Sequence, residues 1–349
     1  MAQINKPSDY FQTKLYTGNG TDNHAITGLN FSPNWTWIKN RGTAHHMLYD
    51  SVRGATKAIF SHLTSAENTS SGHLKSFDSD GFTLGDNSGT GSTNGNTETY
   101  FAHNWKAGGT ASSNTDGSIT SSVSASTASG FSIVSYVGTG ATATVGHGLG
   151  AVPKMIIVKD RDASANWNTY HVEVGNAKTV QLNTSNAESS TSSWNSTTPT
   201  SSVFSLGAVG AVNTSGNNYI AYCFAEKKGF SRIGSYYGNN STDGTFVNTM
   251  MKPAFTLIKN ASGAFDWLMQ DSTRQADANF IGNPVNILNQ ANANNSESNA
   301  STRSVDYLSN GFKIRNTSGA WNTSGNKFIY ISFAEQPLVG TNNIPSTGV

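Results

Sequence analysis

Short apolar runs alternate with stretches rich in glycine, asparagine, serine and threonine along the whole chain. The runs at 34–38, 154–158 and 254–258 are partly β-branched, a pattern typical of central strands that are buried on much of both faces. No segment places Leu, Ala, Glu and Lys at helical spacing over several turns. Ser, Thr, Asn and Gly disfavour helices because they compete for backbone hydrogen bonds or add chain entropy. The pattern therefore predicts an all-β protein.

A signature with fixed spacing occurs three times, which indicates an internal repeat. A Tyr-x-Gly motif is followed by a proline seventeen residues after the tyrosine, and a lysine stands six residues after the proline. Each proline begins a predicted central strand, where its missing N–H costs no ladder hydrogen bond. Eight residues after the lysine come Met47, Trp167 and Trp267, which are predicted to pack under the sheet. The signature residues are Tyr16, Tyr136 and Tyr236, then Pro33, Pro153 and Pro253, then Lys39, Lys159 and Lys259.

The second half of each copy repeats more loosely. A penultimate strand with alternating polarity is followed by a turn of Gly and Asn, residues that tolerate positive φ, and we expect a hairpin there. An aromatic strand then closes each copy. The penultimate strands are predicted at 82–85, 204–207 and 312–315, the turns at 94–96, 215–217 and 324–326, and the closing strands at 100–107, 219–226 and 328–335.

These boundaries predict three tandem antiparallel β-sandwich domains of a jelly-roll or lectin-like type, each of a size that can bury its own core. The second and third copies abut, so we expect them to pack as a rigid pair, whereas a Ser/Thr/Gly-rich stretch reads as a flexible linker. The predicted division is an N-terminal arm at 1–9, repeat one at 10–107, the linker at 108–129, repeat two at 130–228, repeat three at 229–338 and a C-terminal arm at 339–349.

Composition excludes several classes of function. Charged residues are 12% of the chain, and the formal net charge is +1, which gives no electrostatic support for binding nucleic acid. No apolar stretch is long enough for a spanning helix, so no membrane insertion is predicted. Residues 1–7 lack the apolar core of a secretory signal, and we expect synthesis in the cytoplasm. The single cysteine, Cys223, excludes an intramolecular disulfide and is predicted to be buried.

No constellation of residues predicts catalysis, a metal or a cofactor. The adjacent His45 and His46 point to opposite faces of a strand, which makes joint metal binding improbable. Glu226 and Glu335 occupy the same position in different repeats, so they are read as strand-end carboxylates rather than a glycosidase pair. Asp-Ser-x-Arg occurs at 50–53 and at 271–274 and is read as an ion pair within a turn, with a ligand clamp as the alternative.

Two tryptophans are candidates for glycan contact. Trp194 and Trp321 lie in polar loops that repeat poorly, and an exposed indole there would stack on a sugar ring. The alternative, which we favour, is that each ring folds back over its own repeat or packs against a neighbouring subunit.

Several strings resemble a domain repeated in the virion proteins of tailed phages, especially phages of marine bacteria and cyanobacteria. The resemblance covers about 10–338 and rests on 14–20 (KLYTGNG), 50–57 (DSVRGATK), 76–85 (SFDSDGFTLG), 145–159 (VGHGLGAVPKMIIVK) and 219–226 (YIAYCFAE). It implies a non-enzymatic structural protein of the virion, in the tail or a tail appendage such as a fiber or adaptor, with other tail or capsid proteins as partners. It identifies no ligand residues.

The resulting expectation is a virion-located homo-oligomer, with threefold or sixfold symmetry preferred by analogy with phage tails. The alternative is a carbohydrate-binding module that attaches the particle to host-surface glycans, an inference from fold analogy alone.

Overall fold

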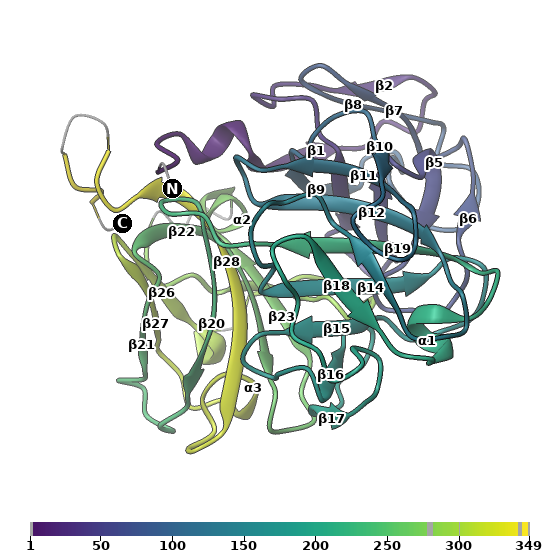
Figure 1. Cartoon of the computed structure of the whole chain (residues 1–349). Helices are drawn as coiled ribbons and strands as arrows, with labels where there is room; N and C mark the ends of the chain where they lie inside the picture. Colours follow the sequence, from purple (N-terminus) through teal and green to yellow (C-terminus); the bar gives the residue numbers. More distant parts are fainter. Residues whose placement is uncertain (1–2, 278–281, 300, 341–343, 348–349) are drawn as a thin grey trace.

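The computed structural model describes residues 3–277, 282–299, 301–340 and 344–347 of the chain. These residues form antiparallel sheets with a few short helical segments, so the all-β prediction is confirmed. The helical segments are η1 (Pro7–Asp9), α1 (Gly210–Asn213), α2 (Ser272–Asp277), η2 (Ser301–Arg303) and α3 (Gly319–Asn322). Figure 1 shows the sheets gathered into one body, with the marked chain ends lying near each other.

Each sequence repeat forms one large sheet, and the three large sheets share one strand order. In repeat one the order is β1 (Phe11–Thr17), β9 (Thr99–Trp105), β3 (Trp35–Asn40), β4 (His46–Asp50), β5 (Gly54–Ile59) and β6 (Asn68–Thr69). In repeat two the corresponding strands are β12 (Phe131–Val137), β19 (Asn218–Phe224), β14 (Met155–Asp160), β15 (Asn168–His171), β16 (Lys178–Gln181) and β17 (Ser189–Ser190). In repeat three they are β20 (Ser231–Tyr237), β28 (Lys327–Pro337), β22 (Met251–Asn260), β23 (Trp267–Asp271), β24 (Ile287–Gln290) and β25 (Ser298–Asn299).

A small sheet accompanies each large one and contains the predicted penultimate strand. These sheets are β2 (His24–Ile26), β8 (Gly81–Leu84) and β7 (Leu74–Asp78) in repeat one, β13 (Ala143–Gly146) and β18 (Val203–Leu206) in repeat two, and β21 (Phe246–Asn248), β27 (Gly311–Ile314) and β26 (Val305–Leu308) in repeat three. Because the penultimate and closing strands belong to different sheets, the Gly/Asn turns cross between sheets and are not hairpins. That prediction was wrong, since local turn chemistry does not reveal which strand pairs with which.

The strands that follow the signature prolines are central, as predicted. Each of β3, β14 and β22 lies between the closing strand of its repeat and the next strand along the chain. Every residue of β3 and β14 is buried, which matches the short, nearly continuous apolar runs of these segments.

Alternation along these strands divides each large sheet into two buried faces. In β19, Tyr219, Ala221 and Cys223 pack into a core private to repeat two, whereas Ile220, Tyr222 and Phe224 point to a core common to all three repeats. Repeats one and three likewise have private cores between their large and small sheets. The buried position predicted for Cys223 is confirmed.

Aromatic contacts in the common core join every pair of repeats. The ring centroids of Trp35 and Tyr222 lie 4.5 Å apart, those of Phe11 and Phe333 5.1 Å, and those of Phe224 and Phe333 6.1 Å. A void of only about 10 Å³ remains at the centre, lined by residues from all three repeats. The repeats are therefore packed together, and repeats two and three do not form a pair apart from repeat one.

One backbone hydrogen bond recurs at each junction and shows that the three repeats close a ring. The N–H of Glu67 in repeat one donates to the carbonyl of Arg161 in repeat two (2.8 Å). The N–H of Glu188 in repeat two donates to Ala261 in repeat three (2.8 Å), and that of Glu297 in repeat three donates back to Arg41 in repeat one (2.7 Å). The arrangement is cyclic because each repeat donates to the next.

The segment at 108–129 is not a flexible linker over its length, which corrects that prediction. Residues in it form β10 (Ser112–Asn114) and β11 (Ser121–Ser126), and they extend the second large sheet, with β11 paired to β12 and β10 at the edge. Val123 and Ser124 of β11 are buried there. A Ser/Thr-rich sequence satisfies its backbone by pairing with an existing edge strand, a tertiary contact that composition does not report.

The Tyr-x-Gly signature fixes the crossing between sheets. Tyr16, Tyr136 and Tyr236 each stack on an aromatic residue of the closing strand, with centroids 4.9 to 5.2 Å apart and planes within 11°. Each hydroxyl donates to a backbone carbonyl of the crossing segment at 2.8 to 2.9 Å. A Cβ at Gly138 would lie 2.2 Å from the carbonyl oxygen of Thr214, and Gly18 and Gly238 are equally confined, so glycine is required.

The common core predicts how the protein unfolds. Phe333 is 2% exposed and its ring contacts aromatic rings from the other two repeats, so Phe333→Ala should lower the free energy of unfolding by about 3–5 kcal/mol. Phe246→Ala, at a side chain 41% exposed, is the matched control and should change little. Urea unfolding should show one transition for the wild type. Separate transitions for the repeats would contradict a shared core.

Candidate functional site

The two predicted glycan-contact residues are buried. Trp194 is 2% exposed and packs in the private core of repeat two, and Trp321, in α3, is fully buried in that of repeat three. Neither indole reaches the surface to stack on a sugar, so the alternative that each ring folds back over its own repeat describes their position. Both tryptophans lie in stretches of mostly polar residues, which suggested exposed loops. In the structure each indole turns inward and packs in the private core of its repeat.

Three signature lysines are buried and hold the loops that follow them. The Nζ atoms of Lys39, Lys159 and Lys259 all donate to backbone carbonyls of the loop just after the central strand. Burial lowers the pKa of each ammonium to about 8. Their role is structural, because each ammonium group donates hydrogen bonds to backbone carbonyls that are not paired in the sheet.

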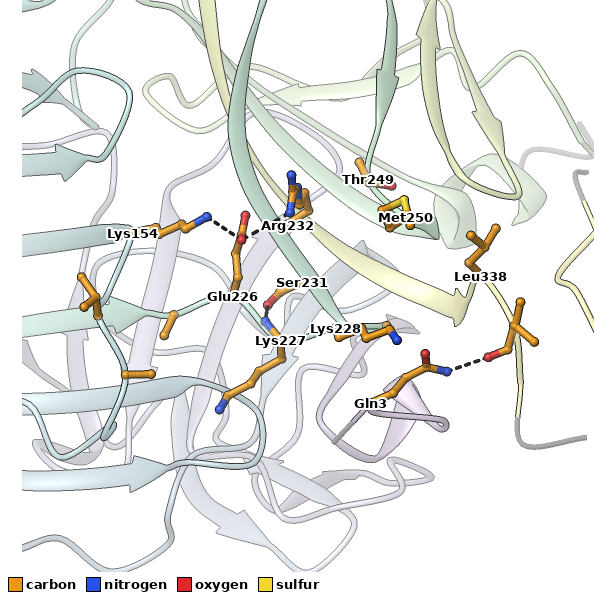
Figure 2. Close-up of a pocket in the computed structure, with 15 residues that line it drawn as sticks. Gln3, Lys154, Glu226, Lys227, Lys228, Ser231, Arg232, Thr249, Met250 and Leu338 are labelled. Atoms are coloured by element: carbon orange, nitrogen blue, oxygen red, sulfur yellow. Dashed lines mark hydrogen bonds and ion pairs between the residues drawn. The ribbon is translucent and has the colours of Figure 1, made fainter. Parts of the chain in front are cut away.

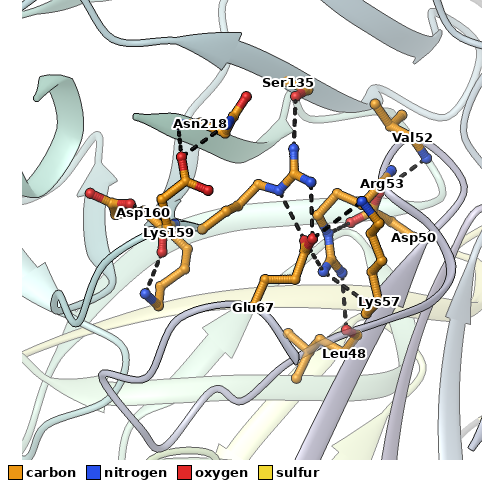
Figure 3. A network of polar contacts seen from close by, with 12 residues as sticks. Leu48, Asp50, Val52, Arg53, Lys57, Glu67, Ser135, Lys159, Asp160 and Asn218 are labelled. Atoms are coloured by element: carbon orange, nitrogen blue, oxygen red, sulfur yellow. Dashed lines mark hydrogen bonds and ion pairs between the residues drawn. The ribbon is translucent and has the colours of Figure 1, made fainter. Parts of the chain in front are cut away.

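The junction between repeats one and two holds a buried charge network, drawn in Figure 3. Arg53 and Asp50, both fully buried side chains, form an ion pair of 2.5 Å, as the Asp-Ser-x-Arg motif predicts. The network extends across the junction: the hydroxyl of Tyr222 donates to Asp50 (2.8 Å), and Glu67 accepts from Arg161 (2.9 Å) and Arg53 (3.1 Å). The motif therefore serves the contact between repeats as well as its own turn.

Opposite charges set the ionisation of this network. Burial lowers the pKa of Arg53, but Asp50, Tyr222 and Glu67 outweigh it and raise that pKa above its usual value. Burial raises the pKa of Glu67, and the two arginines more than reverse the effect. Arg53 and Glu67 are therefore both charged at neutral pH.

The junction between repeats three and one repeats this arrangement. Arg274 pairs with Asp271 at 2.5 Å, and Glu297 bridges Arg274 (3.3 Å) and Arg41 (2.7 Å). His103 takes the place of Tyr222, with its Nε2 3.9 Å from the Asp271 carboxylate. Burial, together with Arg274, lowers the pKa of His103 to about 3 against the opposing effect of Asp271.

The junction between repeats two and three departs from the pattern. His171 stands at the register position of Asp50 and Asp271, and its Nε2 faces the carbonyl of Tyr330 at 3.3 Å. Burial lowers the pKa of His171 to about 4. Glu188, the third of the junction glutamates, pairs with Lys178 (2.7 Å) and Lys327 (2.9 Å).

The strand register shows that Met47 is not the residue of repeat one that corresponds to Trp167 and Trp267. The partner of Lys39 is His46, just as Lys259 pairs with Trp267, so His46 rather than Met47 occupies the tryptophan position. The indole N–H groups of Trp167 and Trp267 donate to backbone carbonyls of the preceding repeat. In repeat one, Trp37 donates to His46 Nδ1 at 2.9 Å instead. The loop of repeat one is one residue shorter, which spacing counted from the lysine cannot show.

His45 and His46, which were expected to point to opposite faces of a strand, both lie near the ring of His62. His45 lies 2.8 Å from His62 through ring nitrogens, and the rings of His46 and His62 are 5.7 Å apart. Burial and neighbouring cations lower the pKa of His62 to about 4. In the described residues no group of three His, Cys, Asp or Glu side chains could hold a metal ion.

The two strand-end glutamates lie apart and are paired with lysines. Glu226 accepts from Lys154 at 2.6 Å and Glu335 pairs with Lys252 at 2.9 Å. Among the helices that the structure describes, none is long and apolar enough to span a bilayer.

A pocket of about 600 Å³ lies between repeats two and three, and we call it the end pocket. Figure 2 shows the Glu226 ion pair on one side and the two chain arms on the other. Gln3 donates to the carbonyl of Val339 at 2.6 Å, which links the arms across the wall of the pocket. The pocket is lined by Gln3, Ala151, Val152, Lys154, Ala225, Glu226, Lys227, Lys228, Gly229, Ser231, Arg232, Thr249, Met250, Leu338 and Val339.

Sequence reasoning missed both the junction glutamates and the end pocket. A signal for the former exists, because Glu67, Glu188 and Glu297 each precede a short run of Ser, Thr or Asn. No comparable signal marks the end pocket, since its walls come from five separate segments of the chain.

The fold and junctions define a class: an all-β protein whose three repeats close around one core. The chain matches the family described as "Domain of unknown function (DUF7483)" over residues 6–337. It belongs to that family. No curated protein and no solved structure matches the chain.

Breaking one buried ion pair should be costly. Arg53→Met leaves the buried side chain of Asp50 without its ion-pair partner, and should lower the free energy of unfolding by about 3–5 kcal/mol. Lys6→Met is the matched control, because Lys6 pairs with Asp9 at the exposed surface and should contribute under about 1 kcal/mol. The double variant Asp50→Leu/Arg53→Met should recover much of the loss. Equal stability of Arg53→Met and wild type in denaturant unfolding would refute this role.

Buried histidines predict loss of stability in mild acid. The pKa values of His103, His171 and His62 are lowered in the fold to about 3, 4 and 4, so the unfolded chain binds more protons below pH 6.5. Stability should be fully present above pH 6.5 and fall by about 1.4 kcal/mol per pH unit for each histidine down to pH 4. Urea unfolding at pH 7.5, 6.0 and 5.0 measures the slope. His171→Gln should make it shallower, and an unchanged slope would contradict the assignment.

Proposed function

We propose that this protein is a non-enzymatic structural component of a tailed-phage virion, in the tail or a tail appendage such as a fiber or adaptor. The observation that carries the proposal is the closed ring of three repeats, joined by the three equivalent glutamate N–H bonds. Virion tails are built around rotational axes, and a chain with near-threefold form fits such an axis.

The distribution of chemistry in the chain supports a structural role. Buried charged and polar side chains, among them Arg53, Arg274 and His171, lie at the junctions between repeats, where they hold the ring together. The resemblance of the signature strings to repeated virion domains points the same way. We also propose that each large and small sheet form a sandwich of the jelly-roll or lectin-like type, a reading supported by the private cores between them.

The proposal includes partners and location. Other tail or capsid proteins are the proposed partners, the virion is the proposed location, and a symmetric homo-oligomer is the proposed state. The alternative, a carbohydrate-binding module for host attachment, has lost the two indoles that motivated it, because both are buried.

Particle analysis tests this function. Virions of a phage that encodes the chain should contain it at a fixed stoichiometry by mass spectrometry, and antibody labelling in negative stain should place it on the tail. A mature particle that lacks the chain, or a label confined to infected-cell lysate, would overturn the proposal. Binding of the purified chain to host glycans without its presence on particles would favour the alternative.

A further inference from the structure

We propose that the end pocket is a docking site for an acidic, aliphatic peptide segment of an assembly partner. This inference deepens the proposed structural function by naming the chemistry of the partner. It rests on the volume of the pocket, its unburied apolar wall and its excess of positive charge.

The end pocket has an apolar wall that is partly exposed to solvent. Val152 is 47% exposed and Met250 50% exposed, and both line the end pocket together with Leu338. Ala151 continues the same wall. These side chains form a concave aliphatic surface, which gains free energy when another apolar group covers it.

Met250 is held in a costly conformation. Its φ of 58° lies in the left-handed region, which side chains other than Gly, Asn and Asp rarely adopt. Its N–H donates to Asn248 Oδ1 (2.9 Å) and approaches the carbonyl of Asn310 (3.2 Å), which fixes the turn. The flexible thioether is thereby presented at the pocket mouth, and methionine at such a position adapts to partner side chains.

Positive charge exceeds negative charge around the pocket. The residues that line it include four basic side chains, Lys154, Lys227, Lys228 and Arg232, and one carboxylate, that of Glu226. Glu226 pairs with Lys154 (2.6 Å) and Arg232 (3.5 Å) and accepts from the N–H of Ile233 (2.8 Å). Among the described residues Lys228 has no ion-pair partner. A carboxylate entering the pocket would therefore meet the ammonium group of Lys228 beside the Glu226 ion pairs.

Two smaller pockets at the ends of the other closing strands lack this combination. One, of about 410 Å³, contains Lys106 as its charged side chain, and the other, of about 370 Å³, balances Lys6 with Glu335. All three lie where a closing strand ends, so the ring architecture accounts for the hollows. It does not account for the charge and the exposed aliphatic wall of the end pocket, which are particular to this junction.

The lining favours peptide over acidic sugar. Sugar rings are bound on aromatic faces, and the described residues that line the end pocket include no aromatic side chain. Aliphatic walls beside ammonium groups match alternating Leu and Asp side chains instead.

The test is fluorescence anisotropy with the full chain and a fluorescein-labelled hexapeptide that alternates Asp with Leu. Two further hexapeptides, Asn with Leu and Asp with Ser, separate charge from apolar contact, and a labelled galacturonate oligomer represents acidic sugar. We expect saturable binding of the Asp/Leu peptide at least about tenfold tighter than the other three probes, and weakening with salt. Equal binding of any other probe, or no saturation, would overturn the proposal.

Variants locate the binding. Lys228→Glu should weaken the Asp/Leu peptide about tenfold or more, whereas Lys106→Glu, the same change at the 410 Å³ pocket, should not. Met250→Asn keeps a residue that tolerates the left-handed turn but removes the thioether, so it should weaken binding with melting temperature retained. Identical affinities of Lys228→Glu and Lys106→Glu would overturn the site. The outcome is independent of particle analysis, since a chain present on virions that binds no peptide would reject this inference alone.

Discussion

The inner faces of the three large sheets are apolar and have nothing to cover them except one another. Trp35, Tyr222 and Phe333 would each be exposed if any repeat stood alone, and each contacts an aromatic ring of another repeat. Burial of these faces favours association of the three repeats. The closed ring, the position of the arms and the hollows between strand ends all follow from this requirement.

Polar groups at the junctions determine how the repeats dock. Hydrophobic faces alone specify docking only loosely, but Asp50 and Glu67 contact Tyr222 and Arg161 across the junction, and a misplaced repeat would lose these buried contacts. The same logic applies to Arg41 and Glu297 at the junction of repeats three and one. At the remaining junction His171 makes a neutral contact, so the three docking surfaces are different and each repeat meets its correct neighbour.

Residues that differ between the repeats give the end pocket its charge and its exposed apolar side chains. The end pocket arises at a position that the ring creates three times, yet only the junction of repeats two and three surrounds it with Lys228, Arg232 and the exposed Met250. Symmetric parts of the chain are explained by packing alone. Lys228 and Met250 have no such packing role, and binding is proposed at the pocket that they line.

The sequence by itself determined the all-β class, the three repeats, the central strands after Pro33, Pro153 and Pro253 and the buried Cys223, because these depend on local periodicity and spacing. It did not determine that the penultimate and closing strands of each repeat belong to different sheets. It also did not determine that residues 121–126 add a strand to repeat two, or that Trp194 and Trp321 are buried. Nor did it show that the repeats share a core. An apolar residue on a strand has the same pattern whether it covers its own repeat or the next one, and only the tertiary structure distinguishes the two.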